Sequence, residues 1–185
     1  MTASHLFFMH ELKKSMKELE RISKEEFLET QKIPIVVILD NIRSMHNVGS
    51  VFRTSDSFLI ERLYLCGFTP TPPHRDIQKT ALGATETVQW FASPEIENCL
   101  LQLKNEDYTI CAVEQVHHSI LLQNFKIEKD KKYALIFGNE VEGVSEKALH
   151  LCDSFIEIPQ LGTKHSLNIS VTAGIVIWEF AKKYF

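Results

Sequence analysis

Short runs of β-branched and aromatic residues recur along this chain from Pro34 onward, and segments of helical or loop character separate them. The runs cover residues 36–40, 62–67, 108–115, 133–139 and 155–159. Their nearly continuous apolar character is typical of parallel strands that are buried on both faces. The intervening segments 47–58, 94–103 and 145–151 and the final segment 167–183 are predicted helices. The sequence therefore predicts an α/β fold with a mostly parallel sheet flanked by helices.

Residues 1–33 differ from the rest because they are dense in charge and contain neither Gly nor Pro. Leu12, Met16, Leu19 and Ile22 recur at spacings of four and three, which predicts an apolar stripe on one side of a helix. Six Lys or Arg residues in this segment are balanced by six Glu residues. We therefore expect a neutral helical extension at residues 1–33 and a single domain at residues 34–185.

Composition excludes several classes of protein. The longest apolar runs are too short to cross a bilayer, and the amino terminus lacks the pattern of a secretory signal. We therefore expect a cytoplasmic protein without membrane segments. The four cysteines form no C-x-x-C pair, so they are expected to be reduced, mostly buried thiols and not metal ligands. No G-x-G-x-x-G or P-loop motif is present, which argues against the dinucleotide and nucleoside triphosphate folds that depend on them.

A formal charge of -4 gives the chain no general attraction for polyanions, so any RNA-binding surface must be a small local patch. Candidate phosphate contacts are Arg43, His74, Arg75, Lys79 and Lys164, each of which alone is typical of a solvated surface charge. Three of them lie in residues 69–79, where prolines and turn-forming residues predict an exposed, mobile loop.

Two polar segments follow predicted strands at the position where α/β proteins place ligands. In residues 40–58, Asn47 and Arg53 lie near a helix start, and the alternatives are a helix cap for Asn47 and a surface ion pair for Arg53. In residues 133–149, Gly138 and Gly143 flank an acidic turn where backbone groups can approach a ligand closely. The alternative there is an ordinary turn with Ser145 as the helix N-cap.

A third polar segment, residues 155–180, leads from a strand into a strongly apolar helix. Ser166, Leu167 and Asn168 open that helix, an arrangement suited to a ligand site beside a subunit interface. A cap role would also explain Ser166, whereas an Asn168 amide facing the core would require polar partners.

In this order, HNVGSVFRT, GNEVEG and IPQLGTKHSLNIS resemble the three motifs of SpoU-type RNA methyltransferases, a family of the SPOUT superfamily that includes the TrmH-like enzymes. The resemblance extends from residue 35 to the carboxyl terminus, and the third motif is the most specific. It implies a deep C-terminal trefoil knot, a homodimer formed through the knot region, and S-adenosylmethionine as cofactor. It also implies methyl transfer to a ribose 2′-hydroxyl of tRNA or rRNA.

Carried over by position, the resemblance implies catalytic roles for Arg53, Asn47, Glu140, Ser166 and Asn168. It implies cofactor contacts, largely through backbone groups, for Val113, Glu114, Gly138, Asn139, Ile158, Gly162, Ser166 and Leu167. Gln160 stands where the family usually has Met, which alters one wall of the cofactor site. The family view makes the arginine a general base, but a guanidinium stays protonated in proteins. We therefore favour Arg53 as a phosphate clamp and a stabiliser of the developing alkoxide, and both views remain open.

Two alternative functions also remain open at the level of sequence. One is a catalytically silent relative that binds RNA or the cofactor, and the other is methyl transfer to an RNA base. The intact Asn47, Arg53, Glu140 and Asn168 argue against decay of the site. TrmH-like tRNA enzymes typically carry basic extensions, so the neutral extension here leaves the RNA unspecified.

Overall fold

The computed structural model describes residues 14–15 and 18–185, and the chain divides into two compact units, residues 1–30 and 31–185. In the described part of the first unit, the helix α2 (Lys24–Glu29) begins after Ser23, which forms a capping box with Glu26. Residues 18–23 form a turn and an irregular segment, so the predicted continuous helix is wrong there, because the capping box starts the helix only at Lys24. The predicted stripe positions Leu12 and Met16 lie outside the described residues.

The second unit is built on a seven-stranded sheet in the order β3-β2-β1-β6-β4-β7-β5, and each neighbouring pair is parallel. The strands are β1 (Ile33–Asp40), β2 (Ile60–Cys66), β3 (Gln89–Ser93), β4 (Tyr108–Val113), β5 (Ile120–Leu121), β6 (Lys132–Phe137) and β7 (Ser154–Glu157). The helices are α3 (Met45–Ser57), α4 (Arg75–Ala81), α5 (Ile96–Asn105), α6 (Glu146–Leu149) and α7 (Ile169–Ala181). Short 3-10 turns are η1 (Ala84–Glu86), η2 (Leu122–Asn124) and η3 (Lys182–Tyr184).

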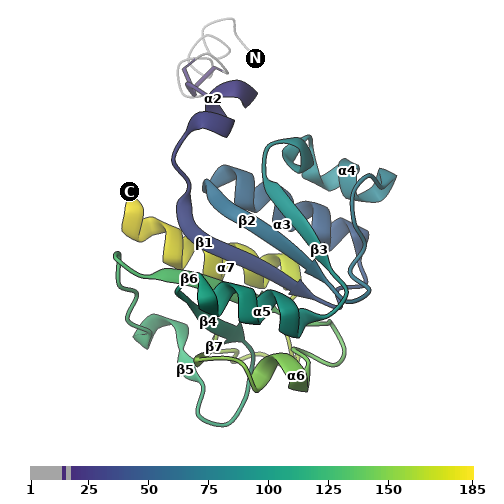
Figure 1. Cartoon of the computed structure of the whole chain (residues 1–185), viewed down its shortest axis with the longest axis vertical. Coiled ribbons are helices and arrows are strands. Elements are labelled where there is room, and N and C mark those ends of the chain that lie inside the picture. Colours follow the sequence, from purple (N-terminus) through teal and green to yellow (C-terminus); the bar gives the residue numbers. More distant parts are fainter. Residues whose placement is uncertain (1–13, 16–17) are drawn as a thin grey trace, which may run out of the picture. The chain divides into compact units, whose positions relative to one another are not determined.

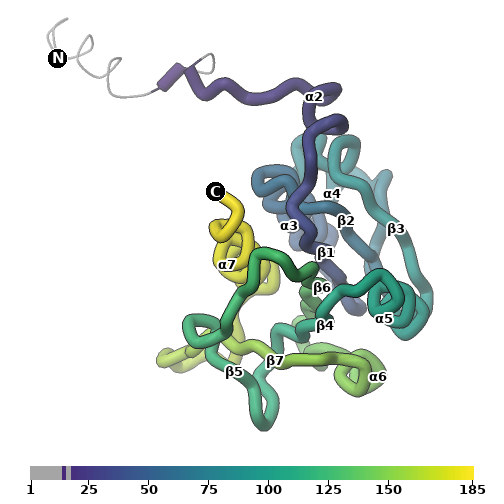
Figure 2. Tube along the Cα trace, turned by 60° about the vertical axis from the view of Figure 1, so that its left-hand side comes forward, coloured from purple at the N-terminus to yellow at the C-terminus, as the bar shows by residue number. Residues whose placement is uncertain are grey.

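The helices cover both faces of this sheet (Figure 1). On the face covered by α5 and α6, Val36 and Ile38 of β1 belong to one core cluster with Leu100 and Leu103 of α5. On the opposite face α3 packs against α7. Figure 2 shows β3 and β5 at opposite edges of the sheet, with β1, β6 and β4 between them. The strands are apolar at nearly every central position because both faces are covered, which confirms the predicted α/β fold with a parallel sheet.

Residues 69–74 form a loop, as their prolines predict, but it is only partly exposed, and residues 75–79 belong to α4. Thr69 is buried, and its hydroxyl donates to the carbonyl oxygen of Leu39 and accepts from the N–H of Ile42, both at 3.0 Å. The last proline is residue 73, so the residues that follow are free to form α4, whose N-cap is His74.

α4 lies very close to α3 at Gly49. A Cβ atom at this position would lie 2.2 Å from the carbonyl oxygen of Ile77 and 2.2 Å from the hydroxyl of Thr80. Only glycine permits this approach, so α4 is held against the helix that carries Asn47 and Arg53.

Two strands were not predicted from sequence. β3 is an edge strand with most of its residues exposed, and β5 has only two residues, so neither has the buried apolar run that marked the other strands. All four cysteines are free thiols; Cys66, Cys99 and Cys111 are buried, as expected, and Cys152 is half-buried. Within the described residues, no helix combines the length and apolar character that a membrane crossing requires. The trefoil knot stays a prediction.

Candidate functional site

A cavity of about 570 Å³ opens at the carboxyl ends of β4, β6 and β7. Parallel strands bring these ends to one edge of the sheet, where open α/β proteins bind their ligands. The volume falls within the roughly 300–1,000 Å³ range of small-molecule sites. The lining residues are Val113, Glu114, Gln115, Phe137, Gly138, Asn139, Glu140, Val141, Gly143, Ile156, Glu157, Ile158, Gln160, His165, Ser166, Leu167, Asn168, Ile169 and Thr172.

Nine of the twelve residues predicted for the site line this cavity. They are Val113, Glu114, Gly138, Asn139, Glu140, Ile158, Ser166, Leu167 and Asn168. Gln160, the departure from the family pattern, also forms part of the wall. Asn47, Arg53 and Gly162 are not among the lining residues. Three sequence segments that are far apart in the chain therefore meet around one cavity.

A chain of hydrogen bonds beside the cavity joins the three polar segments 40–58, 133–149 and 155–180. The Asn47 side-chain amide donates to Glu140 Oε1 at 3.0 Å, and the Asn168 amide donates to Asn47 Oδ1 at 3.2 Å. The partners are 93 and 121 residues apart in the sequence. The second carboxylate oxygen of Glu140 accepts from the backbone N–H of Arg43 at 3.4 Å. Asn47 thus reaches the site through Glu140 and Asn168 without lining the cavity itself.

The hydrogen bonds at the helix starts show which residues cap α3, α6 and α7. Ser44, and not Asn47, is the N-cap of α3, and its hydroxyl accepts from the Asn47 N–H at 3.3 Å. Asn168 is the N-cap of α7, because its Oδ1 accepts from the Ser170 N–H at 2.9 Å. Its amide group does not face the core and instead stays free to bind Asn47. Ser145 precedes α6, but its hydroxyl makes no capping bond.

A tight turn from Asn139 to Gly143 carries Glu140. Asn139 and Gly143 exchange two backbone hydrogen bonds of 2.9 and 3.0 Å, and the Asn139 amide donates to the Asn41 carbonyl oxygen at 2.7 Å. Gly143 has φ +73°, and a Cβ atom there would lie 2.3 Å from Glu114 Oε2. A Cβ atom on Gly138 would lie 2.1 Å from the carbonyl carbon of Gly143. Both glycines are therefore needed for the turn to close against Glu114.

Glu114 supports the wall of the cavity from β4. Its Oε2 accepts from the Val144 N–H and its Oε1 from the Gln115 N–H, both at 2.9 Å. The backbone N–H of Glu114 donates to the Ile156 carbonyl oxygen at 3.0 Å. This carboxylate therefore fixes the backbone on either side of the cavity, and both of its oxygens are occupied.

Arg53 and Gly162 lie apart from the cavity wall. Arg53 is exposed on α3, six residues beyond Asn47, which corresponds to about 9 Å along a helix axis. Its guanidinium has no hydrogen-bond or ion-pair partner among the described residues. Gly162 lies in an exposed loop, where a Cβ atom would meet nothing within 4 Å. The roles predicted for these two residues stay predictions.

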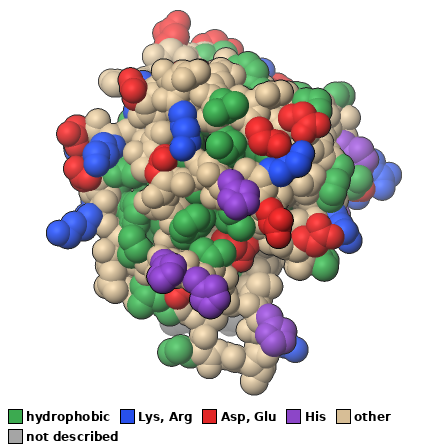
Figure 3. Space-filling model, turned by 60° about the horizontal axis from the view of Figure 1, so that its bottom comes forward, with side chains coloured by type: hydrophobic (Ala, Val, Ile, Leu, Met, Phe, Trp, Pro, Cys, Tyr) green, Lys and Arg blue, Asp and Glu red, His purple; other side chains and the backbone are tan. Residues whose placement is uncertain are grey.

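An acidic residue, Asp76, lies among the cations of the predicted phosphate patch. Asp76 pairs with Lys79 at 2.8 Å and with Arg75 at 3.7 Å, so one carboxylate of the same helix offsets part of the charge of these two cations. Arg43 and Lys164 are exposed. On the face drawn in Figure 3, acidic and basic side chains are interspersed and several histidines gather. The drawn face carries no broad basic field.

Several lining residues were missed by sequence reasoning. Phe137 lies directly before Gly138 within a predicted strand, so its position was a usable signal, whereas Ile156 pairs with Val113 only through the order of the strands in the sheet. Thr172 follows Asn168 by one helical turn and shares its face of α7. His165 and Glu157 carried no signal, because a charged or polar residue at a loop is ordinarily solvated. Within the described residues, no group of three or more His, Cys, Asp or Glu side chains is placed to hold a metal ion.

Comparisons with known proteins agree with this geometry. Residues 34–178 match the model of the SpoU rRNA Methylase family. A tRNA (guanosine(18)-2′-O)-methyltransferase from Thermus thermophilus is 30% identical over 163 residues, covering 88% of this chain and 81% of the relative. The enzyme of the same name from Aquifex aeolicus is 31% identical over 170 residues, covering 88% of this chain and 75% of the relative.

Two solved structures have the same fold. The A. aeolicus TrmH/SpoU tRNA modifying enzyme superimposes with a TM-score of 0.75 at 27% identity, over 86% of this chain and 80% of that one. An AdoMet-bound rRNA methyltransferase from Sinorhizobium meliloti gives a TM-score of 0.77 at 22% identity, over 86% of this chain. This chain spans only 60% of the length of the Sinorhizobium protein. With the family match extending over most of the sheet, the cavity and all three motifs, the chain belongs to the SpoU rRNA methylase family.

Proposed function

We propose that this protein transfers a methyl group from S-adenosylmethionine to a ribose 2′-hydroxyl of tRNA or rRNA. The observation that carries the proposal is the hydrogen-bond chain Asn168–Asn47–Glu140 beside a cavity at the carboxyl ends of three parallel strands. The Thermus and Aquifex relatives are both named as 2′-O-methyltransferases of a tRNA guanosine, which favours a ribose over a base as the acceptor.

The cavity suits this cofactor in size and in the chemistry of its lining. Leu167 offers apolar surface for an adenine ring beside the buried Phe137 and Ile156, and the lining carboxylates suit a cationic ligand. When bound there, S-adenosylmethionine supplies a methyl group on an electrophilic sulfonium. Backbone groups of the Gly138–Gly143 segment would hold it, because this segment forms part of the cavity wall.

The polar residues at the rim would position the acceptor. Ser166 offers a hydroxyl and Asn168 an amide on the exposed side of the cavity, and the bond from Asn168 to Asn47 restricts where that amide points. Alignment of the acceptor oxygen with the methyl group accounts for much of the acceleration that such a transfer needs. Glu140 would act as a positioning residue, since its carboxylate holds Asn47.

For Arg53 we propose a phosphate clamp that also stabilises the developing alkoxide. Its guanidinium is exposed and has no partner among the described residues, so its five N–H donors are available to an RNA phosphate. Arg53→Ala should raise the KM for RNA and lower the rate of methyl transfer by about 100-fold in total. Arg53→Lys keeps the charge and loses the fork of donors, so its loss should be smaller.

We also propose a homodimer that forms through α7. Val171, Ile175 and Trp178 follow each other at spacings of four and three, and each is 40–50% exposed. Phe58 and Phe185 contact Trp178 in tilted arrangements, with ring centroids 5.6 and 5.9 Å away, and extend this apolar surface. Such a stripe is suited to a second copy of the same helix. Light scattering should give twice the monomer mass, and Trp178→Glu should reduce it to the monomer mass.

Product analysis tests the reaction. The purified protein is incubated with methyl-labelled S-adenosylmethionine and unmodified tRNA or rRNA, and the RNA is hydrolysed with alkali. Label in alkali-resistant dinucleotides is expected, because a methylated 2′-oxygen cannot attack the neighbouring phosphodiester. Label in mononucleotides would instead show methylation of a base, and cofactor binding without any transfer would show a silent relative. We also propose a cytoplasmic location, because the proposed substrate is tRNA or rRNA.

A further inference from the structure

Acidic side chains line the cavity, and no Lys or Arg side chain of the described residues accompanies them. Three carboxylates, Glu114, Glu140 and Glu157, are among its lining residues, and no Lys or Arg of the described chain is. His165 is the remaining titratable side chain of the lining, apart from these acids. A recess lined by one sign of charge focuses its field on whatever enters, so this cavity favours a positively charged ligand.

Two of these carboxylates already have partners within the protein. Glu114 accepts hydrogen bonds from the backbone N–H groups of Val144 and Gln115. Glu140 accepts from the Asn47 amide and from the backbone N–H of Arg43. Their negative charge is partly offset by these donors, and their oxygens are held in place by the fold.

Glu157 differs from both. It is the last residue of β7, it is half-buried, and its side chain has no hydrogen bond or ion pair with any described residue. Its backbone position is fixed by pairing with Leu121 of β5. A half-buried carboxylate without a protein partner interacts with a nearby cation more strongly than a fully solvated one does.

We propose that Glu157 recognises the positive charge of the cofactor and makes the cavity prefer the methyl donor over the demethylated product. This inference rests on the proposed function. The donor carries a sulfonium, an ammonium and a carboxylate, so its net charge is positive. The product has a neutral thioether in place of the sulfonium and has no net charge. The negative charge of Glu157 therefore gives different affinities for two molecules that are nearly the same in shape.

Equilibrium binding to the full chain, measured by calorimetry without RNA, tests the proposal. The probes are S-adenosylmethionine, S-adenosylhomocysteine and a donor analogue in which an amine-bearing carbon replaces the methylated sulfur. We expect the wild-type protein to bind the donor and the charged analogue about tenfold more tightly than the product. Glu157→Gln should lose most of this preference, with a fall of about tenfold for the donor and less for the product.

Two further variants complete the design. Glu157→Asp retains the charge on a shorter side chain and should keep part of the preference. Glu146→Gln removes an exposed carboxylate at the start of α6 that does not line the cavity, and it should bind all three probes as the wild type does. Thermal melts of each variant show that the fold is intact.

The outcomes distinguish a failure of the role proposed for Glu157 from a failure of the proposed function. An unchanged ratio of donor to product affinity in Glu157→Gln would overturn the role of Glu157, while methyl transfer itself would stand. A charged analogue that binds only as weakly as the product would do the same, because it would show that charge is not recognised. If the wild-type protein bound neither donor nor product, the proposed function would fail, and this inference with it.

Discussion

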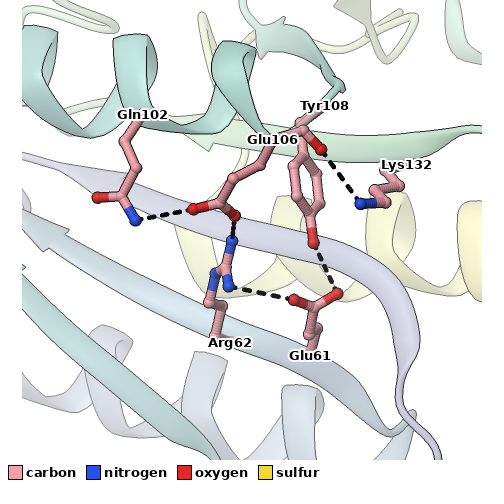
Figure 4. Close-up of polar contacts among 6 residues, drawn as sticks. All are labelled: Glu61, Arg62, Gln102, Glu106, Tyr108 and Lys132. Atoms are coloured by element: carbon pink, nitrogen blue, oxygen red, sulfur yellow. Dashed lines mark hydrogen bonds and ion pairs between the residues drawn. The ribbon is translucent and has the colours of Figure 1, made fainter.

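The sheet carries a polar network at each of its two ends, and the two networks are built from different kinds of side chain. At the carboxyl ends of the strands, Asn47, Glu140 and Asn168 are joined by amide hydrogen bonds beside a cavity. At the amino ends of β2, β4 and β6, ion pairs and aromatic contacts connect a cluster of charged residues (Figure 4). The first network is built from two amides and one carboxylate, and the second is built around a partly buried guanidinium with two ion pairs.

The amino-end cluster is centred on Arg62, whose side chain is only 15% exposed. Arg62 pairs with Glu106 and, at 3.3 Å, with Glu61, and the Tyr108 hydroxyl donates to Glu61 at 2.6 Å. Lys132 donates to the carbonyl oxygen of Glu106 at 3.1 Å, and its ammonium lies 5.3 Å from the Tyr108 ring centroid. Burial, and then the bond to Glu61, raises the pKa of Tyr108, so it stays a neutral donor. This end of the sheet therefore serves stability, whereas the other end is available for ligands.

The largest effect is expected from Asn168→Asp at the carboxyl end. Aspartate keeps the oxygen that caps α7 but loses the amide that donates to Asn47. Methyl transfer should fall about 100-fold because the acceptor is no longer aligned, while the melting temperature should stay at the wild-type value. Single-turnover methylation and thermal unfolding measure the two effects.

Asn168→Ala is the matched variant, because it removes the cap as well as the amide. It should show a similar loss of rate and should also lose about 1 kcal/mol of unfolding free energy. Full methylation activity in Asn168→Asp would break the comparison, since the carboxyl-end network would then have no part in the reaction.

Arg62→Ala at the amino end should lower the stability of the protein and leave the rate of methyl transfer unchanged, which is the reverse of Asn168→Asp. It leaves the partly buried Glu106 and Glu61 without their cation, which should cost about 2 kcal/mol of unfolding free energy and lower the melting temperature by roughly 4–8 °C. Below the transition, the rate of methyl transfer should be unchanged. Lys131→Ala, which breaks an exposed pair with Glu128, should leave the melting temperature as it is. A rate loss in Arg62→Ala as large as that in Asn168→Asp would show that the two ends are coupled.

A smaller effect is expected when the pH is lowered. The hydrogen bond from Gln102, followed by that from Arg62, lowers the pKa of Glu106, although burial opposes the shift. Because the unfolded chain then binds the proton more readily, the stabilisation from Glu106 is complete above the unfolded pKa of about 4.3 and is lost as the pH falls through the lower, folded value. Glu106→Gln should therefore be less stable at pH 7 and should lose less stability between pH 5 and pH 3. Urea unfolding at a series of pH values tests this, and parallel curves for the two proteins would contradict it.

The smallest effect is expected from Gly162→Ala. This glycine does not line the cavity and has open space around its Cα, so donor affinity and stability should both match the wild type. Gly143→Ala is the comparison, because its methyl group would meet the Glu114 carboxylate and its φ is positive, so it should weaken donor binding. A loss of affinity in Gly162→Ala equal to that in Gly143→Ala would show that the exposed loop moves onto the ligand.

The sequence predicted the strands whose burial requires apolar residues. It did not predict the contacts that depend on the order of the strands in the sheet. The runs that became β1, β2, β4, β6 and β7 were predicted because strands covered on both faces must be apolar throughout. The contact between Asn47 and Glu140 was not predicted, because it requires β6 to insert beside β1, which local spacing along the chain does not reveal. α4 was missed because three prolines concealed a helix that starts just after them, and Glu157 was missed because an acid at a strand end ordinarily faces water.

The long sequence separation within the carboxyl-end network has a consequence for how the chain folds. Asn168 comes 121 positions after Asn47, so the bond between them closes a very large loop and must wait for the final helix to dock. Contacts of such high order form late and slowly. A chain still emerging from the ribosome can assemble the Arg62 cluster, whose members end at Lys132, before it can assemble the catalytic rim. Methylating activity thus requires that α7 has docked against α3.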